Sequence, residues 1–206
     1  MDLTINENTC LKDLIRIEKN VISDELCDEI INEYKDDLFY EAGVLEEEEM
    51  SRKWRNCGVI KTSNPENLKI NNRRKEIDNI IYESVTKYGF SFLSSLNATG
   101  KINSDSGYDL LKYEEGQYYK EHFDECSLYT KENGEIVNES MVKRKLTYII
   151  QLNDDFEGGG LSFWGDTYRI KIEKGSALMF PPYYLFPHQV LPVTKGIRYS
   201  LITWLF

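Results

Sequence analysis

The second half of the chain alternates short segments rich in β-branched, aromatic and aliphatic residues with turns built on glycine and proline. Runs of this kind, bounded by turn residues, are typical of short β-strands. Eight strands are predicted in this way, over residues 108–113, 118–124, 143–153, 160–164, 167–173, 176–180, 185–190 and 197–205. Eight short strands separated by turns favour a jelly roll, whose two packed sheets enclose an interior wide enough for a small ligand.

The first half of the chain carries helical signals instead. Ser23 can cap a helix whose first turn holds Asp24 and Glu25, two acids that the helix dipole favours at this end. Asn64-Pro65 opens a second helical region, which we expect to end at Gly89. Its apolar stripe repeats with the helical period at Ile77, Ile80, Ile81, Val85 and Tyr88. Helices that precede a run of strands predict a mainly β protein of the α+β class, with the helices packed on the outside.

The remaining N-terminal segments complete a single predicted domain over residues 1–206. Residues 1–12 are expected to form a loose polar arm, and residues 14–22 and 54–62 are each expected to form a strand. A chain of 206 residues can bury a sizeable core, and single β-rich domains reach this length. Hydrophobic content of 41% with 13% aromatic residues suits a β-rich globular protein rather than a disordered one.

Charge and cysteine usage exclude several classes of partner. Proteins that bind nucleic acid usually present a basic face, so a formal net charge of −10 argues against nucleic acid as a partner. A local basic groove would still be compatible with this net charge. No apolar run approaches the roughly 18 residues of a membrane span, and the N-terminus lacks the features of a signal peptide. The four cysteines show no Cys-x-x-Cys spacing, so neither a zinc finger nor a redox motif is indicated. A cytoplasmic protein without a membrane partner is therefore expected.

The chain has only two histidines, and one of them lies beside a carboxylate. His122 and Asp124 are two residues apart, so on a β-strand they would face the same side, about 6.6 Å apart. His188 follows 66 residues later. Two histidines and one carboxylate are the facial triad of non-haem Fe(II) oxygenases, which leaves positions open for a cosubstrate and O₂. A His-x-Asp tripeptide alone is a weak signal, and a single histidine is more often an ordinary surface or half-buried imidazole.

The residues after His188 strengthen the oxygenase interpretation. Arg198 lies in a strand-like run that a predicted turn over residues 192–196 separates from His188. By alternation, Arg198 shares its strand face with Ser200, Ile202 and Trp204. A rival interpretation is a structural zinc site, because Cys126 continues the alternation of His122 and Asp124 and thiolate with imidazole suits Zn(II). A closed site of that kind would leave Arg198 without a role.

These residues belong to an ordered set of motifs: Tyr113-x-x-Gly116-Gln117-x-Tyr119-x-x-His122-x-Asp124, then Arg144-x-x-Thr147, then Gly158-Gly159-Gly160-Leu161-x-Phe163, then His188 with Arg198 ten residues later. The set resembles the prolyl 4-hydroxylase branch of the 2-oxoglutarate/Fe(II)-dependent oxygenases, from about residue 14 to the C-terminus. The resemblance implies a double-stranded β-helix, that is, a jelly roll, with iron near its open end. It also implies Fe(II), 2-oxoglutarate and O₂ as cofactor and cosubstrates, with ascorbate as an additional candidate.

The resemblance implies a role for each candidate site residue. His122, Asp124 and His188 would bind the metal, and Arg198 would bind the far carboxylate of 2-oxoglutarate through its planar guanidinium. The family often places Lys at the position of Arg198. Tyr113 and Thr147 would contact 2-oxoglutarate, Tyr119 would lie near the substrate mouth, and Trp204 would share the interior with Arg198. From the residues alone, the two tyrosines and Thr147 could equally be strand residues favoured for packing, and Arg198 a surface residue.

The implied reaction is oxidative decarboxylation of 2-oxoglutarate to succinate and CO₂, coupled to hydroxylation of a C–H bond. Halogenating relatives lack the carboxylate ligand, so the presence of Asp124 favours hydroxylation. A peptidyl proline is the first expected substrate, in a peptide or protein that would be rich in proline. A free amino acid or small metabolite is the second, and a non-catalytic jelly-roll binding module is the third. Only an enzyme would turn over 2-oxoglutarate with Fe(II).

Two long polar segments are candidates for lids at the mouth of the barrel. They are residues 38–51, which contain the charge run Glu46-Glu47-Glu48-Glu49, and residues 125–141. Long loops in compact domains are often functional, although a solvated loop and an inert hairpin remain the alternatives.

Overall fold

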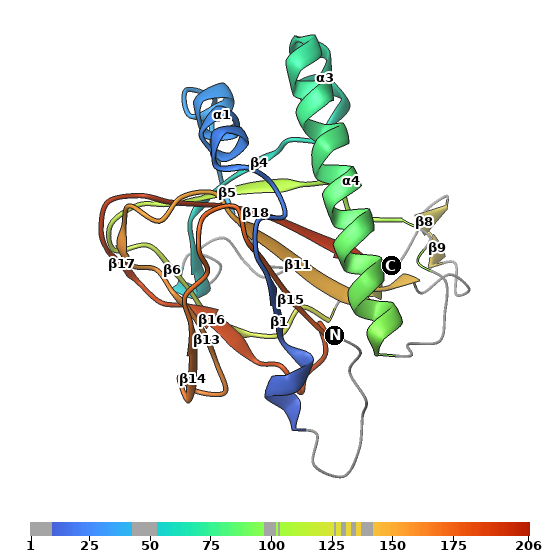
Figure 1. Ribbon diagram of the computed structural model, residues 1–206, viewed down its shortest axis with the longest axis vertical. Helices are drawn as coiled ribbons and strands as arrows, with labels where there is room; N and C mark the ends of the chain where they lie inside the picture. The colour runs from blue at the N-terminus through green and yellow to red at the C-terminus, as the bar shows by residue number, and fades with distance from the viewer. Residues whose placement is uncertain are drawn as a thin grey trace.

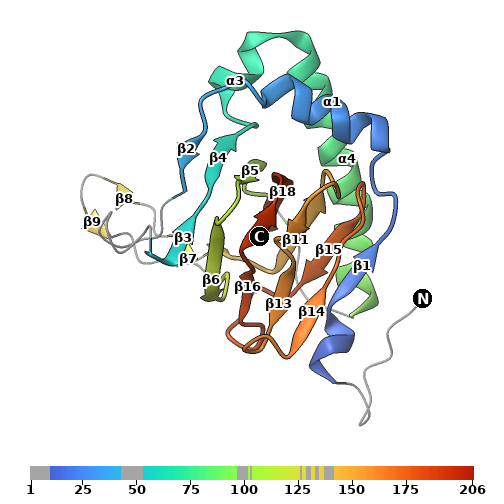
Figure 2. The same ribbon diagram turned by 90° about the vertical axis from the view of Figure 1, so that its left-hand side faces the viewer.

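The computed structural model describes residues 10–42, 53–96, 102, 104–125, 127–128, 131–132, 135–136 and 142–206. Two antiparallel sheets pack against each other within this part of the chain, and helices cover the outer face of the larger sheet (Figure 1). The layers are seen from the side in Figure 2. This is the mainly β jelly roll with flanking helices that the spacing of strands and turns predicted.

The larger sheet has seven strands in the spatial order β1-β15-β11-β18-β5-β4-β2. Their bounds are β1 Arg16–Glu18, β15 Ala177–Phe180, β11 Leu146–Gln151, β18 Arg198–Leu205, β5 Asp109–Tyr113, β4 Gly58–Lys61 and β2 Tyr40–Glu41. The smaller sheet has five strands in the order β14-β13-β16-β6-β3. Their bounds are β14 Tyr168–Ile170, β13 Leu161–Phe163, β16 His188–Val190, β6 Tyr118–His122 and β3 Arg55–Asn56.

Short strand pairs complete the β-structure. They are β12 Glu157–Gly158 with β17 Val193–Lys195, β7 Ser127–Leu128 with β10 Val142–Lys143, and β8 Lys131–Glu132 with β9 Glu135–Ile136. The helices are the 3₁₀ helix η1 Leu11–Leu14 and the α-helices α1 Asp24–Tyr34, α3 Pro65–Ile70 and α4 Asn72–Ser95. The predicted cap of α1 is confirmed, because the Ser23 hydroxyl accepts a hydrogen bond from the Leu26 amide at 3.2 Å.

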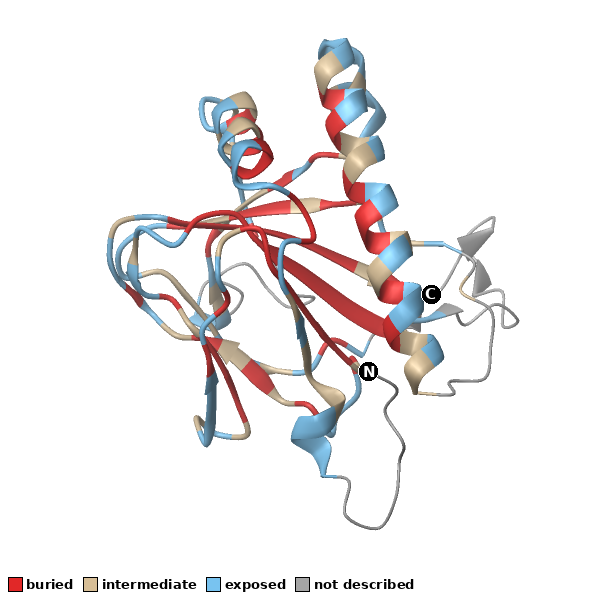
Figure 3. Cartoon of the chain, in the orientation of Figure 1, coloured by how far each residue is buried: buried red, intermediate tan, exposed pale blue. Residues whose placement is uncertain are grey.

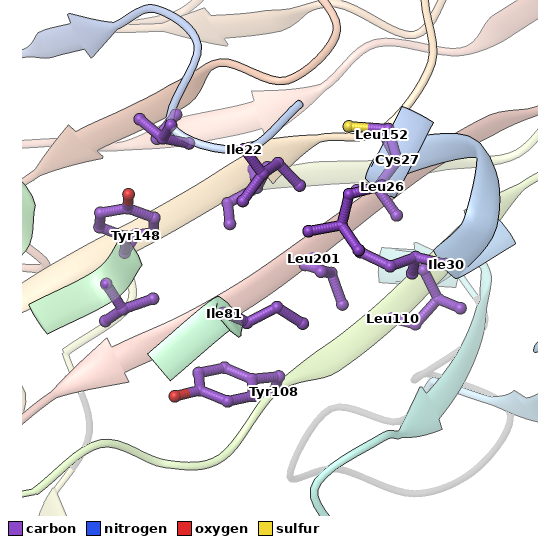
Figure 4. Packing of buried hydrophobic residues seen from close by; sticks show 14 of the residues in the cluster. Ile22, Leu26, Cys27, Ile30, Ile81, Tyr108, Leu110, Tyr148, Leu152 and Leu201 are labelled. Atoms are coloured by element: carbon purple, nitrogen blue, oxygen red, sulfur yellow. The ribbon is translucent and has the colours of Figure 1, made fainter. Parts of the chain in front are cut away.

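Strand alternation gives the larger sheet two distinct faces. Along β18, Tyr199, Leu201 and Leu205 face the helices, whereas Arg198, Ser200, Ile202 and Trp204 face the interior between the sheets. Figure 3 shows the outcome as buried central strands and a buried stripe along α4. In Figure 4, side chains of α1 and α4 such as Leu26, Ile30 and Ile81 meet Leu110 and Leu201 of the sheet. The helices therefore seal the outer face and leave the inner face for a cavity.

Helix α4 continues past Gly89 to Ser95, so the predicted end of this helix is wrong. Gly89 is buried and faces the larger sheet, where an added Cβ would lie 2.8 Å from Cδ1 of Leu205. The glycine thus permits close approach between helix and sheet, and tertiary packing holds the helix through a residue of low helix propensity.

Several predicted segments are subdivided in the structure, among them the helical region that opens at Asn64-Pro65, which is divided at Asn71 into α3 and α4. Residues 14–22 hold the end of η1 and only three strand residues, β1. Residues 54–62 hold two strands separated by Cys57, because β3 pairs with β6 of the smaller sheet whereas β4 pairs with β5 of the larger one. The predicted turn over residues 192–196 contains β17, which pairs with β12, and Gly196 closes it with a φ of 79°.

Several predictions fall outside the described residues. These are most of the N-terminal arm, the charge run Glu46–Glu49, Cys126 with its rival zinc site, and most of the two candidate lids. Among the helices that are described, none combines the length and the hydropathy needed to cross a bilayer.

Candidate metal centre

Strand pairing brings the two histidines together. β6 and β16 are antiparallel neighbours in the smaller sheet, and His122 and His188 are direct cross-strand partners. Directly opposed residues on adjacent strands have their side chains within contact distance. Their imidazole centroids accordingly lie 4.3 Å apart.

Asp124 completes the cluster from a position just beyond the strand. Because β6 ends at His122, the irregular segment that follows places Asp124, and not the strand alternation that the sequence suggested. Its Oδ1 lies 3.5 Å from Nε2 of His122, and its Oδ2 lies 3.6 Å from Nε2 of His188. The three donor atoms lie within 4.8 Å of one another and could hold one metal ion.

Both imidazoles are oriented by backbone carbonyls. Nδ1 of His122 lies 2.8 Å from the carbonyl oxygen of Lys120, and Nδ1 of His188 lies 3.0 Å from that of Phe186. A carbonyl oxygen can only accept, so each Nδ1 carries the proton and donates it. In the neutral form of each ring, Nε2 then presents a lone pair toward Asp124, which is the tautomer a metal ligand requires.

Residues of β11 and of the segment just before it also form hydrogen bonds with the carboxylate and the backbone of Asp124. The Thr147 hydroxyl donates to Oδ2 of Asp124 at 2.8 Å, and Nη1 of Arg144 donates to the Asp124 carbonyl oxygen at 2.8 Å. Hydrogen bonds of this kind fix the orientation of a ligating carboxylate. Thr147 was expected to contact 2-oxoglutarate. In the structure its hydroxyl binds the carboxylate at the metal centre, and the contact with 2-oxoglutarate stays a prediction.

Burial and charge favour the protonation states of a metal site. Burial lowers the pKa of His188 to about 4, which Asp124 opposes only in part, so this imidazole is neutral at pH 7. Burial would raise the pKa of Asp124, but His188 and His122 outweigh it and hold that pKa well below its usual range. Two imidazoles and one carboxylate are a donor set that suits Fe(II) and related divalent metals.

A cavity of about 550 Å³ opens beside this cluster, between the two sheets. Arg198 and Tyr113 line it, and they are cross-strand partners on β18 and β5 with the guanidinium 5.3 Å from the ring centroid. Arg198 is 2% exposed and donates from Nε to Oε1 of Gln151 at 3.1 Å. Within the described residues it has no carboxylate partner, and burial lowers its pKa.

The cavity holds buried polar atoms with no partner in the described part of the chain. They include the Tyr113 hydroxyl, the Ser200 hydroxyl and Nε1 of Trp204. A buried polar atom without a hydrogen bond is costly, as is a buried guanidinium without an anion. A polar, anionic ligand that reaches Arg198 from the metal cluster would satisfy this lining, so the residues present fit both a metal and a dicarboxylate cosubstrate.

The structure gathers most of the predicted site residues in one place. His122, Asp124, His188, Tyr113, Tyr119, Arg198 and Trp204 all line the cavity. The Tyr119 ring stacks on the His122 imidazole, with centroids 3.5 Å apart. Thr147 acts from behind Asp124.

Sequence reasoning gave no role to three further residues of the site. Arg144 was recognised only as part of a motif, yet its guanidinium lies over the Trp204 ring at 3.6 Å. Gln151, which binds Arg198, shares a strand face with Thr147 and could have been found by alternation along β11. Arg55 reaches the cavity only through the pairing of β3 with β6, for which the sequence offered no signal.

Comparison with known sequences finds a family model that matches the second half of the chain. The sequence model of the 2OG-Fe(II) oxygenase superfamily matches residues 108–206. A PKHD-type hydroxylase of Alteromonas mediterranea is 32% identical over 97 residues, which cover 46% of this chain and 40% of that protein. A putative prolyl 4-hydroxylase of Acanthamoeba polyphaga mimivirus is 33% identical over 112 residues, covering 48% and 45%. The chain thus spans less than half the length of these curated relatives.

Solved structures show the same fold over nearly the whole chain. A viral collagen prolyl hydroxylase from Paramecium bursaria Chlorella virus-1 superposes with a TM-score of 0.64 at 21% identity, covering 93% of this chain and 95% of that one. A Trichoplax adhaerens prolyl hydroxylase, solved with a hypoxia-inducible-factor peptide fragment, gives a TM-score of 0.67 at 18% identity, covering 94% and 83%. Residues 108–206 thus match the sequence model of the 2OG-Fe(II) oxygenase superfamily, and this part of the chain resembles the prolyl 4-hydroxylase-like branch.

Proposed function

We propose that this protein is a 2-oxoglutarate- and Fe(II)-dependent dioxygenase that hydroxylates a C–H bond. The observation that carries the proposal is the junction of two features in one cavity: the His122, Asp124 and His188 cluster, and the buried Arg198 with no carboxylate partner in the described residues. A zinc site or a simple binding module would need at most the metal cluster, and would have no use for the buried Arg198. The metal cluster and Arg198 together match a 2-oxoacid with a second carboxylate: its 2-oxoacid end would bind the metal, and its second carboxylate would bind Arg198.

In this proposal the two histidines and Asp124 hold Fe(II), and Arg198 holds the distal carboxylate of 2-oxoglutarate. When bound, Fe(II) supplies the coupled oxidative decarboxylation of 2-oxoglutarate and hydroxylation of substrate, with O₂ as oxidant and succinate and CO₂ as products. Gln151 fixes the Arg198 guanidinium from one side, which prepares its free edge for a carboxylate. Tyr113, with its unpartnered hydroxyl beside Arg198, is a second donor for 2-oxoglutarate.

The remaining predicted residues serve substrate and metal. Tyr119 and Trp204 line the cavity and would flank the reacting carbon with aromatic surface that excludes water. Thr147 orients Asp124. The use of ascorbate, which the family resemblance implies as an additional candidate, stays a prediction.

For the substrate we propose a prolyl residue within a peptide or protein. The support is the prolyl 4-hydroxylase-like branch that the chain resembles, together with a solved relative that is in complex with a peptide fragment. A free amino acid or small metabolite is the second candidate, favoured by a cavity of only about 550 Å³.

The test is 2-oxoglutarate turnover with Fe(II), followed by mass spectrometry of a proline-containing peptide library. We expect succinate release, and the gain of one oxygen atom on selected prolines. His122→Ala and His188→Ala should abolish both, whereas Gln189→Ala, on the same strand as His188, is the matched control and should keep them. Absence of any 2-oxoglutarate turnover by the Fe(II)-loaded protein would refute the enzymatic proposal, and turnover coupled only to a free amino acid would select the small-molecule alternative.

A further inference from the structure

Arg55 lies on the cavity wall close to the metal cluster. It begins β3 and is the cross-strand partner of Tyr119 on β6. Its guanidinium lies 4.8 Å from the Tyr119 ring centroid, and that ring is stacked on His122 at 3.5 Å. The Arg55 guanidinium, the Tyr119 ring and the His122 imidazole therefore lie in a row along the cavity wall. A single aromatic ring separates the charge of Arg55 from a candidate metal ligand.

Arg55 has no carboxylate partner in the described part of the chain. Its Nε is buried without a hydrogen bond, and none of the ion pairs formed there includes it. Arg74 shows what this chain does with a buried arginine elsewhere. Its guanidinium contacts Glu33 and Asp37, each at 2.8 Å. Arg55 as a whole is half-buried, with its Nε fully enclosed, and a partly desolvated charge without a counter-ion is costly. Arg55 therefore has the character of a group that can bind an anion.

The other charged groups that the structure describes around the cavity do not supply this anion. Asp109 on β5 interacts electrostatically with Arg55 and with Lys61 and Arg144, but it forms no ion pair with Arg55, and burial raises the pKa of Asp109. Glu125 lines the cavity but is exposed. The carboxylate of Asp124 belongs to the candidate metal cluster with both histidines and accepts a hydrogen bond from Thr147.

The cosubstrate does not neutralise Arg55 either. In the proposed function, the two carboxylates of 2-oxoglutarate go to the metal and to Arg198, so both of its charges are used. The divalent metal, Asp124, Arg198 and the 2-oxoglutarate dianion then balance one another. Arg55 leaves its own end of the cavity positive, in a protein whose formal net charge is −10. A positive cavity wall in an acidic protein selects anions by local attraction rather than by its overall field.

We propose that Arg55 is an anion subsite that binds a carboxylate of the substrate beside the carbon to be hydroxylated. This inference rests on the proposed function and refines it by naming a substrate class. The carboxylate can come from an acidic residue next to the target residue of a peptide, or from the main-chain carboxylate of a free amino acid. Either source places the anion one aromatic ring from His122, which fixes the distance between the charged group and the reacting carbon.

The test compares ligands that differ by one charge. The full chain is loaded with Fe(II) and 2-oxoglutarate without O₂, and binding is measured calorimetrically for a proline peptide with Glu beside proline and its Gln counterpart. A second arm compares free proline with prolinamide. For the source that the site uses, we expect the acid to bind roughly tenfold to hundredfold more tightly than its amide, the range for one charged hydrogen-bonded contact.

Variants of Arg55 assign the preference to this residue. Arg55→Gln should reduce the ratio of acid to amide affinity to near one, and Arg55→Lys should keep much of it because the charge remains. Arg169→Gln is the matched control, since Arg169 is an exposed arginine that pairs with Asp166 on the surface.

Two results would overturn the inference while leaving the dioxygenase function in place. One is equal binding of acid and amide in both arms. The other is a fall in 2-oxoglutarate affinity in Arg55→Gln as large as the fall in substrate affinity, which would assign Arg55 to the cosubstrate. Because binding is read without turnover, failure of the proposed reaction would not be mistaken for either result.

Discussion

Replacing Arg198 by leucine separates cosubstrate binding from protein stability. In the proposed complex the guanidinium makes two charge-assisted hydrogen bonds to a carboxylate, each worth about 1.5–3 kcal/mol. Losing them should cost about 3 kcal/mol or more, which raises the 2-oxoglutarate concentration required for turnover on the order of 100-fold. Arg198→Lys should be milder, because one cationic donor remains.

The same substitution should leave the unliganded fold nearly as stable as before. Arg198 is 2% exposed, and removing a buried charge that has no counter-ion relieves the cost of its desolvation. Against this, Oε1 of Gln151 loses its donor, at a cost of about 1–3 kcal/mol. We therefore expect a melting temperature within a few degrees of wild type.

The assay is thermal unfolding with and without saturating 2-oxoglutarate on the metal-loaded protein, beside measurement of 2-oxoglutarate consumption. Wild type should gain about 2.7 kcal/mol at a ligand concentration of 100 Kd, and Arg198→Leu should gain almost nothing at that concentration. Arg74→Leu is the matched control, because it removes another buried arginine but leaves the carboxylates of Glu33 and Asp37 without their ion-pair partner. This variant should be less stable than wild type and should keep the stabilisation by 2-oxoglutarate. Normal 2-oxoglutarate dependence in Arg198→Leu would refute the assignment of this residue.

Three further predictions follow from local geometry. Thr147→Val removes the hydrogen bond to Asp124 and keeps the side-chain shape, so metal affinity measured by titration should fall about 10- to 100-fold; an unchanged affinity would mean that this bond does not orient the carboxylate. Gly158→Ala should lower the free energy of unfolding in urea by about 1–3 kcal/mol more than Gly116→Ala. Both glycines have positive φ, but only at Gly158 would the new Cβ collide with a backbone oxygen, at 2.3 Å from Pro192, and equal losses would contradict this. Burial raises the pKa of Cys27 to about 12, so its thiol stays protonated and should resist alkylation at pH 8 while exposed Cys10 reacts; peptide mapping that finds both labelled in the folded protein would argue against this burial.

The sequence by itself determined the architecture and the chemistry of the metal cluster. Strand segments between glycine and proline turns can bury their apolar residues only by pairing into packed sheets, so the jelly roll followed from local patterning. His122, Asp124, His188 and Arg198 were recognisable because metal and carboxylate chemistry restricts which residue types can serve. Alternation along β18 also placed Trp204 correctly in the same interior as Arg198.

Only the tertiary structure decided which groups act on that cluster from other strands. Thr147 is 23 residues from Asp124 and binds it because β11 runs behind the metal site. Arg55 enters the cavity because the chain crosses between the two sheets at Cys57, which a single strand prediction over residues 54–62 concealed. Helix α4 continues through Gly89 because only a residue without a side chain lets the helix pack this closely against Leu205. Each outcome depends on contacts between residues far apart in sequence, and local propensity carries no information about such contacts.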